Sequence, residues 1–237
     1  MVGKSLPRIG TGNVFAFVHR LEARPNERLE RFLVEQGVDP GQATTFLSDG
    51  GDTVRQAQGE FRQFGEPILD WFHLTMRMTQ LSQTIKGLPV EEPEDTVEFL
   101  RSLRRAKAFL WHGSPHRALK VIENLTWEIG VETDAAKNIQ DKLEEFMDYV
   151  TANLPAIPNY ADRRRHGEPI ATGFVESAVN QVVSKRFVKK QQMRWTPQGA
   201  HQLLQVRVRT LNHQLRGDFE RWHPRLRIAN TAIPLAA

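Results

Sequence analysis

The middle of the chain carries three successive apolar patterns with the period of an amphipathic helix. In each pattern the apolar residues are separated by four, three and four positions. They are Phe99, Leu103, Ala106 and Leu110; Ala118, Ile122, Leu125 and Ile129; and Ile139, Leu143, Phe146 and Val150. Residues three and four positions apart share one face of an α-helix. The spacing therefore predicts an all-helical bundle of three helices, without a strand between them.

On the N-terminal side of this bundle, short apolar runs alternate with helical patterns. Strands are predicted over residues 13–19, over 43–49 and from residue 66, and helices over 26–37 and 52–65. A further helix begins at Trp71, where apolar residues again step by three and four. Alternating strands and helices predict an α/β layer with a largely parallel sheet.

The C-terminal side of the bundle has a different pattern. Residues 153–173 are rich in proline and charge and are predicted to form a loop. A helical pattern resumes at Gly173, and a last helix is predicted with Thr196 as its N-cap, Pro197 at its first position and Gly217 at its end.

Composition excludes several classes of protein. The 237 residues include no cysteine, so disulfides, thiol chemistry and cysteine-ligated zinc are excluded. No run of 18 apolar residues is present, and the N-terminus lacks the apolar segment of a secretory signal. We therefore expect a cytoplasmic protein without membrane contact.

Charge is unevenly distributed along the chain. Residues 161–237 contain 14 Lys and Arg against 5 Asp and Glu, a net charge of +9, whereas the remainder carries 18 against 23, or −5; the sum is the overall +4. A basic C-terminal third indicates a polyanionic partner, with nucleic acid the first choice. The alternative is a solvated basic face that binds no ligand.

Two acids stand where a metal site could form. Asp49 directly follows a predicted strand, at the edge where α/β sheets usually bind ligands. Glu176, 127 residues later, lies in the first turn of a predicted helix. Converging carboxylates bind Mg²⁺ or Mn²⁺, and such ions catalyse phosphoryl transfer. Alternatively, Asp49 begins an Asx-turn and Glu176 stabilises its helix N-terminus.

A second strand-to-helix junction carries "DWFH", with Asp70 and His73. Asp70 has the position of a helix N-cap. His73 is a candidate proton carrier or DNA contact beside the acids. A buried histidine whose hydrogen bonds are satisfied is the alternative.

A basic segment follows Glu176 in "SKRFVKKQQMRW". Its candidate DNA contacts are Lys185, Arg186, Lys189, Lys190, Arg194 and Trp195. The cations would neutralise phosphates, and an exposed aromatic ring would stack on bases. The aromatic residue inside the segment, Phe187, is also compatible with a core position.

Several of these stretches together resemble a known family. "TFLSDGGDTVR", "ILDWFHLTMRMTQL", "FLWHG", "NYADRRRHGEPI" and "ESAVNQVVSKRFVKKQQMRWTPQGAHQLLQVRVRTLN" are similar to the catalytic domain of bacterial insertion-sequence transposases of the DDE type, in the Mutator-like group. The resemblance covers about residues 2–216. It implies an RNase H-like fold in which Asp49 is the second catalytic aspartate and Glu176 the final acid. It also implies that Asp70 and His73 assist.

The resemblance also implies the organisation of the chain. The first part of the RNase H-like domain would span 1–92, an all-helical insertion 93–155, the rest of the catalytic domain 156–216 and a tail 217–237. Expected partners are transposon-end and target DNA, with a second copy or a full-length transposase as subunit, in the nucleoid. The expected activity is metal-dependent DNA cleavage and strand transfer.

The chain departs from the family pattern at its start. The family's first catalytic aspartate precedes a "VGKS"-like stretch, which here begins at residue 2. We therefore expect an N-terminally truncated layer without its first strand, and a weakly active or inactive enzyme. Glu22 is the nearest substitute acid, and Asp52 is a weak alternative to Asp49. The second hypothesis is a non-catalytic protein that binds DNA ends or transposase subunits and regulates transposition.

Overall fold

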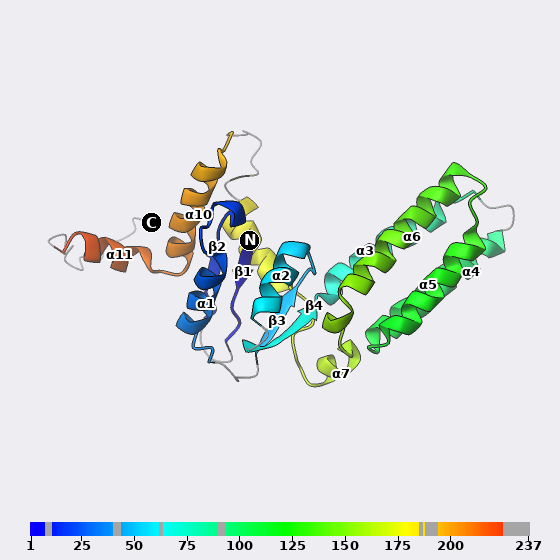
Figure 1. Cartoon of the computed structure of the whole chain (residues 1–237), viewed down its shortest axis with the longest axis horizontal. Helices are drawn as coiled ribbons and strands as arrows, with labels where there is room; N and C mark the ends of the chain where they lie inside the picture. Colours follow the sequence, from blue (N-terminus) through cyan, green and yellow to red (C-terminus); the bar gives the residue numbers. More distant parts are fainter. Residues whose placement is uncertain are drawn as a thin grey trace, which may run out of the picture. The chain divides into compact units, whose positions relative to one another are not determined.

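The computed structural model describes residues 1–7, 11–39, 44–61, 64–89, 93–184, 187 and 194–224. The chain divides into two compact units (Figure 1). We call them the terminal unit, Met1–Gly37 with Phe174–Ala237, and the central unit, Val38–Gly173. Each contains one two-stranded sheet among its described residues, together with several helices. The mixed α/β class is thus confirmed, and the RNase H-like layer stays a prediction.

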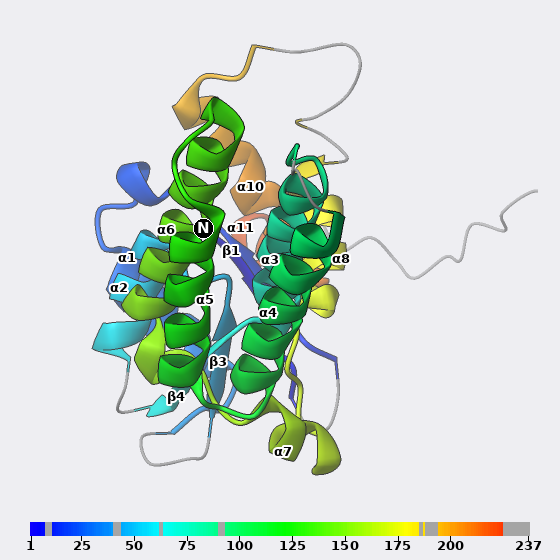
Figure 2. The same cartoon turned by 90° about the vertical axis from the view of Figure 1, so that its right-hand side faces the viewer.

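Four helices form most of the central unit: α3 (Trp71–Lys86), α4 (Pro93–Trp111), α5 (Pro115–Ile129) and α6 (Asp134–Ala152). They lie side by side in both views (Figures 1 and 2). All twelve apolar positions of the three predicted patterns are buried, as are Leu74, Met78, Leu81 and Ile85 of α3. They join one core, which confirms the predicted helical register.

The small sheet of the central unit is parallel. Strand β3 (Thr45–Ser48) pairs with β4 (Glu66–Leu69), and α2 (Asp52–Glu60) lies between them in sequence. Beyond α6, the segment predicted as a loop contains two short helices, η3 (Leu154–Ala156) and α7 (Tyr160–Arg165). That prediction was wrong for α7, because the buried Tyr160 anchors this turn: its hydroxyl donates to Leu69 O at 2.8 Å.

The terminal unit begins with an antiparallel hairpin of β1 (Val2–Lys4) and β2 (Val14–Ala16). Strand β1 was not predicted, and the expectation of a largely parallel sheet is wrong for this unit. The 3₁₀ turn η1 (His19–Leu21) and helix α1 (Pro25–Glu35) follow. The C-terminal helices are α8 (Gly173–Val179), the π-helical η4 (Asn180–Ser184), α10 (Pro197–Leu211) and α11 (Leu215–Trp222).

Helix α10 begins as predicted but ends earlier. Thr196 caps it, since the side-chain oxygen accepts from Gly199 N at 3.1 Å. Its predicted end at Gly217 was wrong: the helix stops at Leu211, and Gly217 lies inside α11. The break occurs at His213, whose φ of 58° belongs to the left-handed region and cannot continue a right-handed helix.

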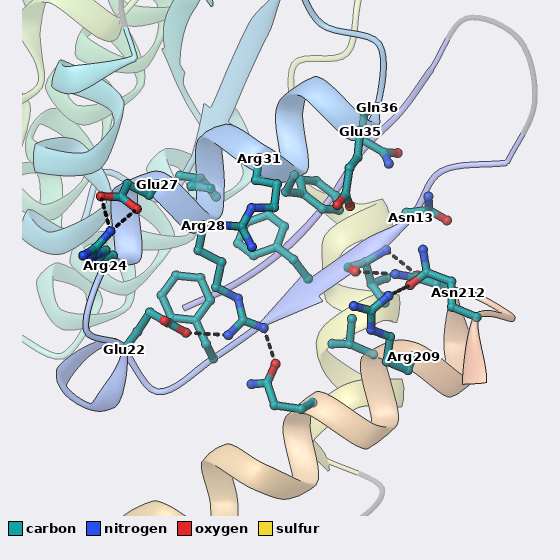
Figure 3. A pocket seen from close by; sticks show the side chains of 18 of the residues that line it. Asn13, Glu22, Arg24, Glu27, Arg28, Arg31, Glu35, Gln36, Arg209 and Asn212 are labelled. Carbon is teal, nitrogen blue, oxygen red and sulfur yellow. Dashed lines mark hydrogen bonds and ion pairs between the residues drawn. The ribbon is translucent and has the colours of Figure 1, made fainter. Parts of the chain in front are cut away.

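Side chains of α10 and of its C-cap residue, Asn212, cover the edge of β2 that β1 leaves open. The Asn212 amide accepts from Val14 N and donates to Val14 O, both at 2.9 Å (Figure 3). Gln205 donates to Ala16 O at 3.4 Å, and His201 Nδ1 accepts from Val18 N at 3.3 Å. Val14 and Ala16 of the strand, and Val18 just beyond it, are thereby paired with side chains instead of with another strand.

Within the described residues, no helix is both long and apolar enough to cross a lipid bilayer.

Candidate active site

Two aspartates leave the central sheet at the same edge. The parallel register places Ser48 opposite Leu69, the last residues of β3 and β4. Asp49 directly follows β3, and Asp70 directly follows β4. The backbone N of Asp70 donates to Ser48 O at 2.7 Å. Both acids therefore stand at the carboxyl ends of parallel strands, where open α/β sheets bind ligands.

Asp70 is fully buried, and both of its carboxylate oxygens have partners. Oδ1 accepts from Phe72 N at 2.8 Å, which confirms Asp70 as the N-cap of α3. Oδ2 lies 2.8 Å from His73 Nδ1 and also accepts from the Thr172 hydroxyl. Because a buried carboxylate without donors would be costly, these contacts account for its burial.

His73 connects this buried acid to the surface. Its side chain is 30% exposed, and its ring meets that of Phe72 edge-on at 5.8 Å between centroids. With Nδ1 directed at Asp70, Nε2 is the nitrogen left for a further partner. The alternative interpretation, a buried histidine whose hydrogen bonds are satisfied, therefore holds for Nδ1 but not for the partly exposed ring as a whole.

Asp49 is exposed and held by its turn. Its Oδ1 accepts from Gly51 N at 3.1 Å, so the alternative Asx-turn is present. At the intervening Gly50, φ is +75° and a Cβ would lie 2.7 Å from the Asn153 Oδ1, so only glycine fits. The turn occupies one carboxylate oxygen of Asp49, and no described residue contacts the other, which is available to a ligand.

Tyr149 of α6 links the two acids electrostatically. Its hydroxyl donates to Asp49 O at 2.9 Å, and the guanidinium of Arg77 lies 4.1 Å from its ring centroid. Burial raises the pKa of Tyr149 to about 12; Arg77 opposes this shift, whereas the negative charges of Asp49 and Asp70 add to it. The Tyr149 hydroxyl thus lies near enough to Asp49 and Asp70 for both charges to disfavour its ionisation.

Glu176 belongs to the terminal unit, where it is exposed in the first turn of α8. This position agrees with the alternative role at a helix N-terminus. Its convergence with Asp49 stays a prediction. The two weaker acid candidates are each paired with arginine: Glu22 with Arg28, and the almost fully exposed Asp52 with Arg55 at 2.5 Å.

The predicted basic segment is described at Ser184, Phe187, Arg194 and Trp195. Lys185, Arg186, Lys189 and Lys190 lie outside the described residues. Arg194 is exposed, and Trp195 is half-buried against Phe187, with 5.3 Å between ring centroids. The Trp195 indole nitrogen is buried and has no hydrogen-bond partner in the described part of the chain. DNA contact by these residues stays a prediction.

The terminal unit contains a hollow of about 520 Å³ between α1, β2 and α10 (Figure 3). Four arginines and three glutamates line it, and they neutralise one another to a large extent. Arg24 pairs with Glu27 at 3.1 Å and Arg28 with Glu22. This charge balance does not favour a polyanion, so we do not assign the hollow to DNA.

Sequence reasoning missed Tyr149, Thr172 and Arg77. Tyr149 and Thr172 reach the site from about a hundred positions away, whereas Arg77 lies on α3, one turn after His73. Across the residues that the structure describes, no group of three or more histidine, aspartate or glutamate side chains could hold a metal ion. Comparisons with family models, curated proteins and solved structures find no match for this chain.

Proposed function

We propose that the chain is the catalytic region of a DDE-type DNA transposase, which cleaves and joins DNA with the help of a divalent metal. The observation that supports this most is the meeting of Asp49 and Asp70 at the carboxyl edge of β3 and β4, with His73 beside them. The basic C-terminal third supports DNA as the substrate.

The donor set fits Mg²⁺ or Mn²⁺ only in part. Asp49 has an exposed carboxylate with a free oxygen, as a hard cation requires. Asp70 does not fit as a ligand, because it is buried and both of its oxygens are engaged. The proposed ligands are therefore Asp49 and Glu176. A metal held there would activate the attacking oxygen and stabilise the leaving one.

The chain's own residues would orient the substrate and handle protons. Asp70 fixes the ring of His73 and favours a proton on its Nδ1. The partly exposed Nε2 can then accept a proton or, once protonated, donate to a phosphate oxygen. The Thr172 hydroxyl donates to the same carboxylate oxygen of Asp70 that His73 contacts. Asp70 is thus a positioning residue in this proposal, and His73 is the group that meets the substrate.

A plasmid-nicking assay tests the catalytic proposal without knowledge of the transposon ends. Supercoiled plasmid is incubated with Mn²⁺ and the wild-type chain, Asp49→Asn, Glu176→Gln or Asp52→Asn. We expect Asp49→Asn and Glu176→Gln to lower nicking at least about 100-fold, because each removes a metal-binding charge. Asp52→Asn is the matched control and should retain wild-type activity. Equal loss in all three variants, or in none, contradicts the assignment.

A DNA-binding protein that does not cleave is the second candidate. It is favoured by the basic C-terminal third, which would bind phosphates whether or not the chain cleaves DNA. Such a protein would bind a short DNA duplex with an affinity that falls as salt is raised. Binding would be weakened by Arg194→Ala and unchanged by Asp49→Asn. DNA binding in a preparation that shows no nicking with Mn²⁺ would favour this second function.

A further inference from the structure

The hollow between α1, β2 and α10 has the size of a small-molecule site (Figure 3). Its volume of about 520 Å³ falls within the range of about 300–1,000 Å³ that ligand pockets usually have. All the residues that line it belong to the terminal unit, so its geometry does not depend on the central unit or on the proposed metal ligand Asp49. The chemistry of its lining indicates which kind of molecule it would hold.

One wall of the hollow is aromatic. The ring of Phe15 neighbours those of Phe17 and Phe32, with centroid distances of 6.2 Å and 4.9 Å. Phe17 is buried, and the guanidinium of Arg28 lies 5.1 Å from its ring centroid. Phe15 and Phe32 are partly exposed and line the hollow. Their rings offer an apolar surface on which a planar aromatic molecule would stack.

Three of the four arginines at the hollow already pair with acids: Arg24 with Glu27, Arg28 with Glu22 and Arg209 with Asp218. Arg31 and Glu35 are the two charged residues of the lining whose side chains form no ion pair or hydrogen bond with another described residue. They are four positions apart on α1, which places them next to each other on one face of the helix. A guanidinium donor and a carboxylate acceptor thus stand side by side at the hollow, and both are available to a ligand.

This lining selects a neutral aromatic molecule with acceptors and donors along its edge. Because the charges of the hollow largely cancel, neither a strong anion nor a strong cation is favoured. Arginine donates to two neighbouring acceptors at once, and a carboxylate accepts from two neighbouring donors. Guanine carries both arrangements on one planar ring system: O6 and N7 accept from arginine, whereas N1–H and N2–H donate to a carboxylate. Of the four DNA bases, only guanine has two adjacent nitrogen donors on its edge.

We propose that the hollow binds a guanine base, carried by a free nucleoside or nucleotide or by an unpaired position in DNA. In the bound state the base stacks on Phe15 and Phe32, and its O6 and N7 accept from Arg31. Its N1–H and N2–H donate to Glu35. Sugar and phosphate lie outside the hollow, whose charge balance does not favour an anion. The site needs no metal and goes beyond the proposed transposase activity, so either can fail without the other.

An NMR titration of the ¹⁵N-labelled full chain with guanosine, without metal or DNA, tests the inference. We expect amide shifts in α1 and β2 and a dissociation constant on the order of 100 µM, which is typical of a ligand of this size. Arg31→Ala and Glu35→Ala should each weaken guanosine binding at least about tenfold, because each removes a bidentate contact. Glu30→Ala is the matched control: Glu30 is exposed on the same helix, does not line the hollow and should not affect binding.

Two nucleoside analogues separate direct contact from a structural effect. Inosine lacks the N2 amino group, and 7-deazaguanosine lacks N7. The wild-type chain should bind each of them at least about fivefold more weakly than guanosine. Glu35→Ala should bind inosine and guanosine alike but still discriminate against 7-deazaguanosine, and Arg31→Ala should show the reverse. If each variant instead lowers all three affinities by the same factor, the assigned contacts are wrong.

Single-stranded DNA identifies the source of the base. An oligothymidylate that contains one guanine is compared with an all-thymine strand of the same length. Tighter binding of the guanine-containing strand identifies unpaired DNA as the source, whereas equal binding of the two strands, with guanosine bound, identifies a free nucleoside or nucleotide. The inference is overturned if guanosine at about 1 mM causes no shifts in α1 and β2, or if adenosine binds as tightly. It is equally overturned if Arg31→Ala and Glu35→Ala bind guanosine like the wild type.

Discussion

The central and terminal units are stabilised in different ways. Among the described residues of the central unit, 21 are buried in one core that extends from the parallel strands through all four long helices. In the terminal unit, five buried residues form the described core: Val14, Ala16, Ala178, Val182 and Leu204. The central unit therefore depends mainly on apolar burial, which is set by helical periodicity.

The terminal unit relies more on polar side chains that bind the backbone. Asn212 and Gln205 pair with Val14 and Ala16 of β2, and His201 pairs with Val18 just beyond the strand. Arg207 donates to Val182 O at 2.9 Å and to Gln181 O, which ties α10 to η4. Few residues are buried here, so each of these hydrogen bonds contributes a larger share of the unit's stability.

The largest expected effect is in the central core. Leu125→Ala removes a fully buried side chain and should destabilise the central unit by about 2–5 kcal/mol. Trp127→Ala, two residues away on the same helix but exposed, should cost about 0.5 kcal/mol or less. Urea unfolding with hydrogen exchange, which separates the two units, measures both. If Leu204→Ala in the terminal unit costs more than Leu125→Ala, the comparison of the two units is wrong.

The next effect tests the polar part of the comparison. Asn212→Ala leaves both backbone groups of Val14 without their partner and should cost about 1–3 kcal/mol in the terminal unit. Asn212→Asp keeps the acceptor and loses the donor, so it should fall between Asn212→Ala and the wild type. Asn180→Ala, at an exposed position of the same unit, is the control. An Asn212→Ala variant as stable as the control would show that the terminal unit does not depend on this amide.

Matched helix caps compare the two units directly. Thr133 caps α6 by accepting from Ala136 N, and Thr196 caps α10 by accepting from Gly199 N, both at 3.1 Å. Either threonine replaced by alanine should cost about 1 kcal/mol. Because the two bonds are alike, the free energies of unfolding should fall equally in the central and terminal units. Unequal losses, measured by hydrogen exchange of α6 and α10, would show that the surroundings alter the contribution of a cap.

An effect of similar size to that of a cap concerns Tyr149, whose hydrogen bond to Asp49 O should contribute about 1 kcal/mol at neutral pH. Its raised pKa means that the folded state favours the protonated phenol. Its contribution is therefore complete below pH 10 and is lost as pH rises through about 12. Tyr149→Phe should reduce the fall in stability between these values.

Ultraviolet titration at 295 nm gives a direct measurement, because the chain has only two tyrosines. Burial raises the pKa of Tyr160 as well, so the folded protein should show no tyrosinate step near pH 10. Tyr149→Phe should remove the step near pH 12. A step near pH 10 in the folded wild type would contradict the burial of these phenols and their proximity to the aspartates.

The same contrast explains what could be predicted from sequence. The register of α3 to α6 follows from apolar spacing alone, since burial requires one face. Strand β1 was missed, because three residues with a glycine in the middle carry no apolar period. The end of α10 was predicted at Gly217 because helices often end at a glycine with positive φ. Here His213 adopts that left-handed conformation instead.

The candidate site was predictable only where local chemistry fixes it. Asp49 and Asp70 each follow a strand in the sequence, and the two strands are parallel neighbours. The motif "DWFH" contains both the N-cap Asp70 and its partner His73. The Asp70–Thr172 and Asp49–Tyr149 contacts join residues about a hundred positions apart. Such pairings depend on tertiary packing, for which a single sequence gives no periodic signal.

The side-chain cover on β2 has a consequence for the synthesis of the chain. Val14 and Asn212 are 198 positions apart, so at typical translation rates the strand is made roughly 10–40 s before its partner amide. During that interval the hairpin presents unpaired backbone groups, which can recruit a strand from another nascent chain. Chaperone demand should therefore be highest before the ribosome reaches α10, and should fall once that helix has emerged.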